Sequence, residues 1–141
     1  MAMKNLRTIA VFALMLGIVV GSVHGQTGTP TIKVNVPFRF AIGGISLSSG
    51  QYSITSVNDR VLVQEASGRS VALLMTRTLG AKAKERNSRV VFDCYFDECF
   101  LSQVWFASLG TGHTLPQSKH QVELAKTSEA KQLILSSKES Q

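Results

Sequence analysis

The chain has 141 residues, a net charge of +6 and two cysteines. This length fits one domain rather than two, and a domain of this size can bury a core without a metal or a dense disulfide framework. A basic chain can indicate nucleic-acid binding, but here most of the excess charge lies in one short segment, which argues for a partner in the cell envelope instead.

The first 25 residues have the pattern of a secretory signal peptide. Lys4 and Arg7 precede an apolar run over residues 9–20, and Val23 and Gly25 suit a cleavage point after Gly25. The run is shorter than the roughly 20 residues of a membrane-spanning helix, although an uncleaved anchor is the alternative. We expect residues 1–25 to be removed and the mature chain to be periplasmic or extracellular.

Residues 31–43 alternate in hydrophobicity with a period of two. One face is uniformly apolar: Ile32, Val34, Val36, Phe38, Phe40 and Ile42. This alternation predicts a half-buried strand with Lys33, Asn35 and Arg39 in water. Pro37 cannot donate a ladder hydrogen bond, so the strand lies at an edge or carries a bulge there. Gly43-Gly44 predicts a turn.

Five more segments are rich in β-branched and aromatic residues and are separated by turn residues: 51–57, 60–66, 70–78, 89–95 and 98–106. The segment 70–78 is apolar on both faces, which predicts a central strand. Together these segments predict a mainly β fold, a six-strand antiparallel meander that forms a small barrel or sandwich.

The C-terminal part changes its pattern. Residues 108–112 read as a loop, and Ser118 with Gln121 fits a capping box that begins a short helix over residues 118–126. We therefore expect a single β-rich domain with a C-terminal helix over residues 26–126. Residues 127–141 are expected to be a frayed or disordered tail.

Both cysteines lie in one predicted hairpin. A two-residue turn at Phe96-Asp97 pairs Cys94 with Cys99 at a cross-strand distance near disulfide range, and places Trp105 on the same face. In an oxidising compartment such a pair reads first as a disulfide. We predict a structural bond between Cys94 and Cys99 that fixes the register of the hairpin.

Three other uses of the cysteines have less support. A thioredoxin-like centre needs a closer spacing at a helix start. A zinc site needs two more ligands, and His113 and His120 lack ligand spacing. A nucleophilic cysteine needs a free thiol and a positioned base. We predict no catalytic residues, no metal site and no cofactor.

Five basic residues stand close together beside the single acid Glu85: Arg77, Lys82, Lys84, Arg86 and Arg89. Such a segment is ordinarily a solvated loop. In an exported protein it is also a candidate anion-binding cluster, with an anionic envelope lipid or polysaccharide as the expected partner and no nucleic acid.

The mature chain resembles a family of small, uncharacterised exported bacterial proteins of unknown function. The resemblance lies in three blocks: Val34-Asn35-Val36-Pro37-Phe38, Phe100-Leu101-Ser102-Gln103-Val104-Trp105 and Leu115-Pro116-x-Ser118. The chain departs from the family pattern at Phe96, where relatives carry Gly, and in having the two cysteines. The resemblance implies no activity, cofactor or partner.

The sequence therefore favours a non-enzymatic envelope or secreted binding or structural module. The alternative is a carrier of a small apolar ligand inside the β-barrel, which requires a cavity lined by Phe38, Phe40 or Leu73.

Overall fold

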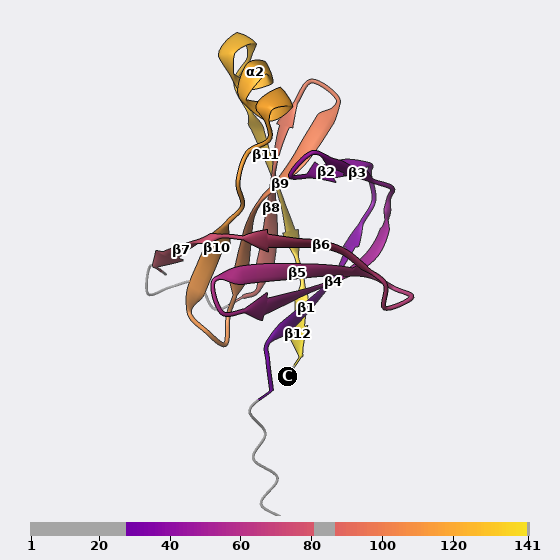
Figure 1. Cartoon of the computed structure of the whole chain (residues 1–141), viewed down its shortest axis with the longest axis vertical. Coiled ribbons are helices and arrows are strands. Elements are labelled where there is room, and N and C mark those ends of the chain that lie inside the picture. The colour runs from indigo at the N-terminus through magenta and orange to yellow at the C-terminus, as the bar shows by residue number, and fades with distance from the viewer. Residues whose placement is uncertain (1–27, 81–86, 141) are drawn as a thin grey trace, which may run out of the picture.

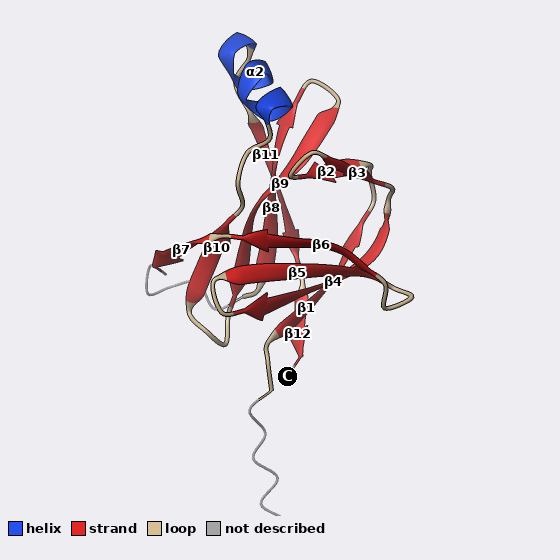
Figure 2. Cartoon of the chain, in the orientation of Figure 1, coloured by secondary structure: helices blue, strands red, loops and turns tan. Residues whose placement is uncertain are grey.

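The computed structural model describes residues 28–80 and 87–140. The expected signal segment lies outside the described residues, as do Lys82, Lys84 and Arg86 of the basic cluster. The described part of the chain contains twelve strands and one helix (Figure 1; Figure 2). The predicted mainly β fold with a short C-terminal helix is confirmed, with more strands than the six expected.

Five strands form the first sheet in the order β12-β1-β4-β5-β6, and every neighbouring pair is antiparallel. The bounds are β1 Thr31–Val36, β4 Gly50–Val57, β5 Arg60–Glu65, β6 Ser70–Met75 and β12 Lys138–Ser140. As the alternation predicts, Ile32, Val34 and Val36 are buried, while Lys33 and Asn35 are exposed. The first strand thus turns its apolar face to the core.

The second sheet has the order β11-β8-β9-β10-β7, with the hairpin β2–β3 attached through β9. The bounds are β2 Phe40–Ile42, β3 Ile45–Leu47, β7 Arg77–Gly80, β8 Arg89–Tyr95, β9 Glu98–Phe106, β10 Thr111–Thr114 and β11 Lys131–Ser136. The turn at Gly43-Gly44 forms as predicted, with positive φ at both glycines. The pairing of β2 with β9 is parallel, so the fold is not a simple antiparallel meander.

Two crossings of the chain join the edges of the two sheets. Only Thr76 separates β6 from β7, and only Ser137 separates β11 from β12. Since β6 and β12 are the edges of the first sheet and β7 and β11 those of the second, each edge continues into an edge of the other sheet. The sheets therefore curl around one core (Figure 1). We call these crossings the Thr76 seam and the Ser137 seam.

The space between the sheets is filled by side chains. Its largest fully buried members are Phe92, Phe106, Ile32, Ile42, Val36, Val61, Val63, Val90 and Val104. The ring of Phe92 packs edge-on against Phe38 and Phe40, with centroids 5.0 and 5.4 Å apart, and Phe40 packs against Tyr52 at 5.1 Å. These contacts have the T-shaped geometry that aromatic pairs favour.

Residues 70–78 do not form a central strand, which corrects the expectation from their apolar pattern. The segment is divided at Thr76, and β6 is the edge strand of the first sheet. Its outer residues Leu73 and Met75 are 53% and 66% exposed. Likewise the strand expected over 31–43 is divided at Pro37, because β1 ends before it and β2 begins only at Phe40.

The segment after residue 127, expected to be frayed, is ordered in the structure. Strand β11 pairs with β8 over six positions, and Leu133 and Leu135 pack against the core. This apolar alternation gives the tail a half-buried face. The predicted helix is present as α2, Lys119–Thr127, and Ser118 caps it by accepting from the Gln121 N–H at 3.2 Å. The expected loop over 108–112 is a turn up to residue 110, and its last two residues begin β10.

A β-bulge in β9 corrects the predicted position of Trp105. Val91 pairs with Gln103 and Phe92 with Leu101, which leaves Ser102 without a partner on β8. The extra residue reverses the faces beyond it. Trp105 therefore lies on the outer face, opposite to the cysteines.

Candidate functional site

A groove of about 640 Å³ opens at the Ser137 seam. Strand β12 pairs with β1 only over three positions, and the chain then leaves the first sheet at Ser137. Residues 34–36 of β1 thus have no β12 partner on that side, and the gap forms the groove. Its polar lining comes from β1, β4 and the crossing: Lys33, Asn35, Gln51, Ser53, Ser136, Ser137 and Lys138.

Two lysines face each other in this groove. Lys33 and Lys138 are directly opposed across the β1–β12 ladder, both are exposed, and no lining residue is acidic. Like charges at opposed positions destabilise a sheet. The next residue, Glu139, forms no ion pair with either lysine, and its carboxylate accepts hydrogen bonds from Ser88 and Ser108. The groove therefore carries uncompensated positive charge.

One residue of the groove lining has a hydroxyl without a partner beneath the surface. Ser137 Oγ is buried and has no hydrogen-bond partner among the described residues. A buried polar group in this condition is costly for the fold unless something else satisfies it. The amides of Asn35 and Gln51 line the groove and give it hydrogen-bonding groups beside its two cations.

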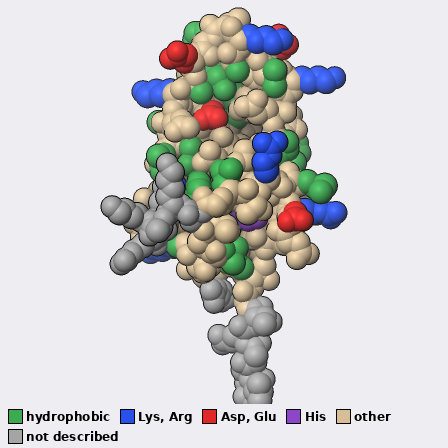
Figure 3. Space-filling view, turned by 90° about the vertical axis from the view of Figure 1, so that its left-hand side faces the viewer, with side chains coloured by type: hydrophobic (Ala, Val, Ile, Leu, Met, Phe, Trp, Pro, Cys, Tyr) green, Lys and Arg blue, Asp and Glu red, His purple; other side chains and the backbone are tan. Residues whose placement is uncertain are grey.

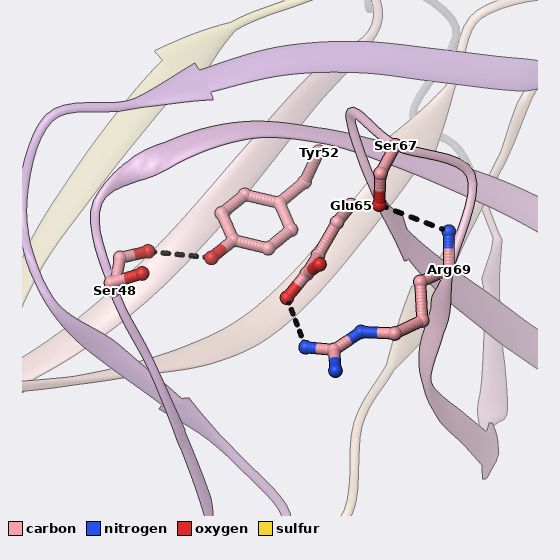
Figure 4. A network of polar contacts seen from close by, with 5 residues as sticks. All are labelled: Ser48, Tyr52, Glu65, Ser67 and Arg69. Atoms are coloured by element: carbon pink, nitrogen blue, oxygen red, sulfur yellow. Dashed lines mark hydrogen bonds and ion pairs between the residues drawn. The ribbon is translucent and has the colours of Figure 1, made fainter.

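Polar contacts also occur just before β4 and at the β5–β6 turn (Figure 4). The Tyr52 hydroxyl donates to the Ser48 carbonyl at 2.6 Å, which fixes the buried ring that packs against Phe40. Arg69 forms an ion pair with Glu65 at 2.7 Å, and this hydrogen bond raises the pKa of the Arg69 guanidinium. Arg69 is thus compensated, unlike the two lysines.

The predicted basic cluster is not gathered into one site by its described members. Arg77 begins β7 and Arg89 begins β8, and β10 and β9 lie between these strands. The Arg89 guanidinium lies 4.8 Å from the centre of the Trp105 ring, in cation–π contact. On the face in Figure 3, basic and acidic side chains are interspersed with hydrophobic ones rather than gathered into one patch.

The two cysteines occupy the predicted register. Cys94 pairs with Cys99 and Tyr95 with Glu98 across the turn at Phe96-Asp97, and the sulfurs are joined in a disulfide. Neither cysteine is free. The bond therefore leaves no thiol for a nucleophile or a metal, and the described residues contain no group of three acidic, His or Cys side chains that could hold one.

A buried polar cluster at the Thr76 seam was not predicted. His113 Nε2 lies 3.3 Å from Ser56 Oγ, and Nδ1 lies 2.8 Å from Thr76 Oγ1. Burial lowers the pKa of His113, with Asp59 acting in the opposite direction. Ser56 and His113 resemble a nucleophile and its base, but they are only 7% and 3% exposed, so a substrate has no direct access.

The sequence does not predict this cluster because Ser56 and His113 are 57 positions apart. The one available signal is the alternation of β4, which places Ser56 on the same buried face as Tyr52 and Ile54. A serine there needs a hydrogen-bond partner in the interior. The alternation thus predicts a polar partner for Ser56 but not which residue supplies it.

The cavity required for a carrier does not match the expected residues. Phe38 and Phe40 pack in the aromatic cluster, and Leu73 points outward from β6, so it cannot line the interior. The grooves at the Ser137 seam, at the Thr76 seam and beside Asn87 are lined by other residues.

Comparison with known proteins yields no assignment: no protein-family model matches, and searches of curated proteins and of solved structures find no match. The family resemblance seen in the sequence thus stays a prediction. Within residues 28–80 and 87–140, no helix is long and apolar enough to cross a membrane. The disulfide is compatible with export.

Proposed function

We propose that the protein is an exported, non-enzymatic binding module that holds an acidic polysaccharide of the cell envelope in the groove at the Ser137 seam. The opposed pair Lys33 and Lys138 is the observation that carries this proposal. The pair is unfavourable for folding on its own, and an anion bound between the two ammonium groups removes the repulsion.

The remaining lining suits a sugar chain better than a lipid. Asn35, Gln51 and Ser53 offer amide and hydroxyl groups, which recognise sugar hydroxyls. A lipid headgroup could use the same cations, but the acyl chains would need an apolar surface beside them. Export is supported by the signal-like segment and by the disulfide.

Calorimetric titration of the oxidised mature chain with polyuronate oligomers tests the proposal, with neutral gluco-oligomers of equal length as the reference. We expect salt-sensitive binding of the acidic oligomer and about tenfold weaker binding for each of Lys33→Gln and Lys138→Gln, as loss of about 1.4 kcal/mol implies. Lys131→Gln, an exposed lysine outside the groove, is the charge-matched control.

Stability provides an independent measurement. Lys138→Glu places opposite charges across the ladder, so it should raise the free energy of unfolding by about 0.2–1 kcal/mol while abolishing binding. The proposal is contradicted if the neutral oligomer binds as tightly as the polyuronate. It is also contradicted if Lys131→Gln loses as much affinity as Lys33→Gln and Lys138→Gln. Binding to anionic phospholipid vesicles but not to the polyuronate also contradicts it and points to a lipid partner.

A further inference from the structure

The tip of the β8–β9 hairpin combines exposure with backbone strain. Phe96 is 79% exposed and has φ +58°, a left-handed conformation that side chains other than glycine's seldom adopt. Such a value at the first residue of a two-residue hairpin turn is ordinarily supplied by Gly. Because the ring lies mostly in water, the core gains little from Phe96, and its strain has no compensation in the folded monomer.

A second groove has the properties needed to receive this ring. It lies at the Thr76 seam, has a volume of about 580 Å³, and its apolar lining is Met75, Leu101, Leu115 and Pro116. Met75 is 66% exposed at the rim, and its flexible side chain can adapt to an inserted ring. Arg77 supplies one positive charge at the same groove.

The charges beside the two features are complementary. Asp97 follows Phe96 at the hairpin tip, and Arg77 lies beside the apolar lining of the groove. Neither side chain has an ion-pair partner within the described part of the chain. An inserted Phe96 ring would bring Asp97 to the rim, where a cation is favourable.

We infer that the Thr76-seam groove binds the Phe96 hairpin tip of a second copy of this chain. The tip and the groove are different surfaces, so the contact is head-to-tail and generates open chains or rings rather than a closed symmetric dimer. A single hairpin tip buries less than the roughly 1,200 Å² at which stable interfaces begin, so the association is weak and concentration-dependent.

Sedimentation velocity of the oxidised mature chain over a range of micromolar to millimolar concentrations tests the inference. We expect the weight-average sedimentation coefficient to rise with concentration. Phe96→Gly should weaken the association at least tenfold without lowering the urea midpoint, because glycine relieves the positive φ. Ile134→Thr, which removes another exposed apolar side chain on β11, is the matched control and should associate like the native chain.

A charge exchange makes the test specific. Arg77→Asp and Asp97→Arg should each weaken self-association, because tip and groove then carry the same charge. An equimolar mixture of the two variants should associate again, because the tip of each variant is opposite in charge to the groove of the other. A native chain that stays monomeric throughout, or a Phe96→Gly variant that associates normally, overturns the inference. Failure of the mixture to recover also overturns it. None of these substitutions touches the lysine groove, so its polyuronate binding is scored separately.

Discussion

His113 Nδ1 lies 2.8 Å from the Oγ1 of Thr76, the residue at which the chain passes from the first sheet to the second. Thr76 Oγ1 donates to the Asp59 carbonyl at 3.2 Å, so it accepts from the ring N–H. The other ring nitrogen then accepts from Ser56. A neutral imidazole on β10 thereby connects to β4 and to the crossing, and ties the two sheets together.

Acidification should loosen this seam. Since burial lowers the pKa of His113, the unfolded state binds more protons near the ordinary histidine value of about 6.5. The neutral ring therefore contributes fully to the free energy of unfolding above about pH 6.5. This contribution declines as the pH falls below that value. We expect the urea midpoint to drop between pH 8 and pH 5 in the native chain.

The control is His113→Gln, which keeps polar groups at this position but does not titrate in this range. It should be less stable than the native chain at pH 8, by about 1–3 kcal/mol for a disturbed buried hydrogen-bond pair. Its midpoint should change less between pH 8 and pH 5. An equal pH response in both proteins would assign the effect to other groups.

Local patterns predicted the strands well, and tertiary pairing accounts for what they missed. The alternation of residues 31–36 and the turn at Phe96-Asp97 are short-range signals, and both hold in the structure. The position of Trp105 depends on the bulge at Ser102. That bulge is satisfied by a distant donor, since the Leu115 N–H donates to the Ser102 carbonyl at 2.9 Å. A period-two pattern read along β9 alone cannot contain this information.

The groove was harder to foresee than the strands. Lys33 is visible as an outward residue of its strand, but its position opposite Lys138 arises from pairing between the two ends of the described chain. The basic residues that are close in sequence gave a stronger local signal, yet Arg77 and Arg89 lie on strands separated by two others. The segment richest in basic residues along the sequence is therefore not the place where two cations face each other on the sheet.

Glu139 should stabilise the Ser137 seam at neutral pH and lose this effect in acid. Burial on its own raises the pKa of this carboxyl, but hydrogen bonds from Ser108 and Ser88 outweigh it and hold the pKa below the ordinary value. A lowered pKa means that the stabilisation is present above about pH 4.5 and is lost as the pH falls through the folded value. Glu139→Gln should therefore lower the free energy of unfolding by about 1–2 kcal/mol at pH 7, after a discount for partial exposure.

Urea unfolding at pH 7 and pH 3 checks this prediction. The native chain and Glu139→Gln should differ at pH 7 and converge at pH 3. Glu123→Gln, on the exposed surface of α2, should change stability by less than about 0.5 kcal/mol at either pH. A difference that persists at pH 3 would show that Glu139 acts through packing rather than charge.

The Cys94–Cys99 bond should stabilise the fold only mildly. It closes a loop with a sequence separation of 5, so it removes little entropy from the unfolded chain. We expect the Cys94→Ala, Cys99→Ala double variant to fold and to lose about 1–3 kcal/mol in urea unfolding. Labelling of the exported native protein should find no reactive thiol. Two reactive thiols would contradict the bond, and a variant that folds normally but loses polyuronate binding would give the hairpin a functional role.

Gly112 should be intolerant of a side chain because of Trp105. The two residues are directly opposed on β10 and β9, and a Cβ at Gly112 would lie 2.7 Å from atoms of the indole. The indole has limited freedom to move, since its N–H donates to the Gln103 side chain at 3.0 Å and the Arg89 guanidinium lies over it. Gly112→Ala should therefore cost about 1–3 kcal/mol, as overpacking does.

A double-mutant cycle separates this clash from the intrinsic cost of replacing glycine. In a Trp105→Leu background, Gly112→Ala should be nearly neutral, so the two substitutions should be strongly non-additive in urea unfolding. Gly80→Ala, at a position in β7 where a Cβ meets open space, is the control and should change stability by less than about 0.5 kcal/mol. Additive losses in the cycle would mean that the indole does not occupy the space above Gly112, and that β9 holds Trp105 elsewhere on its outer face.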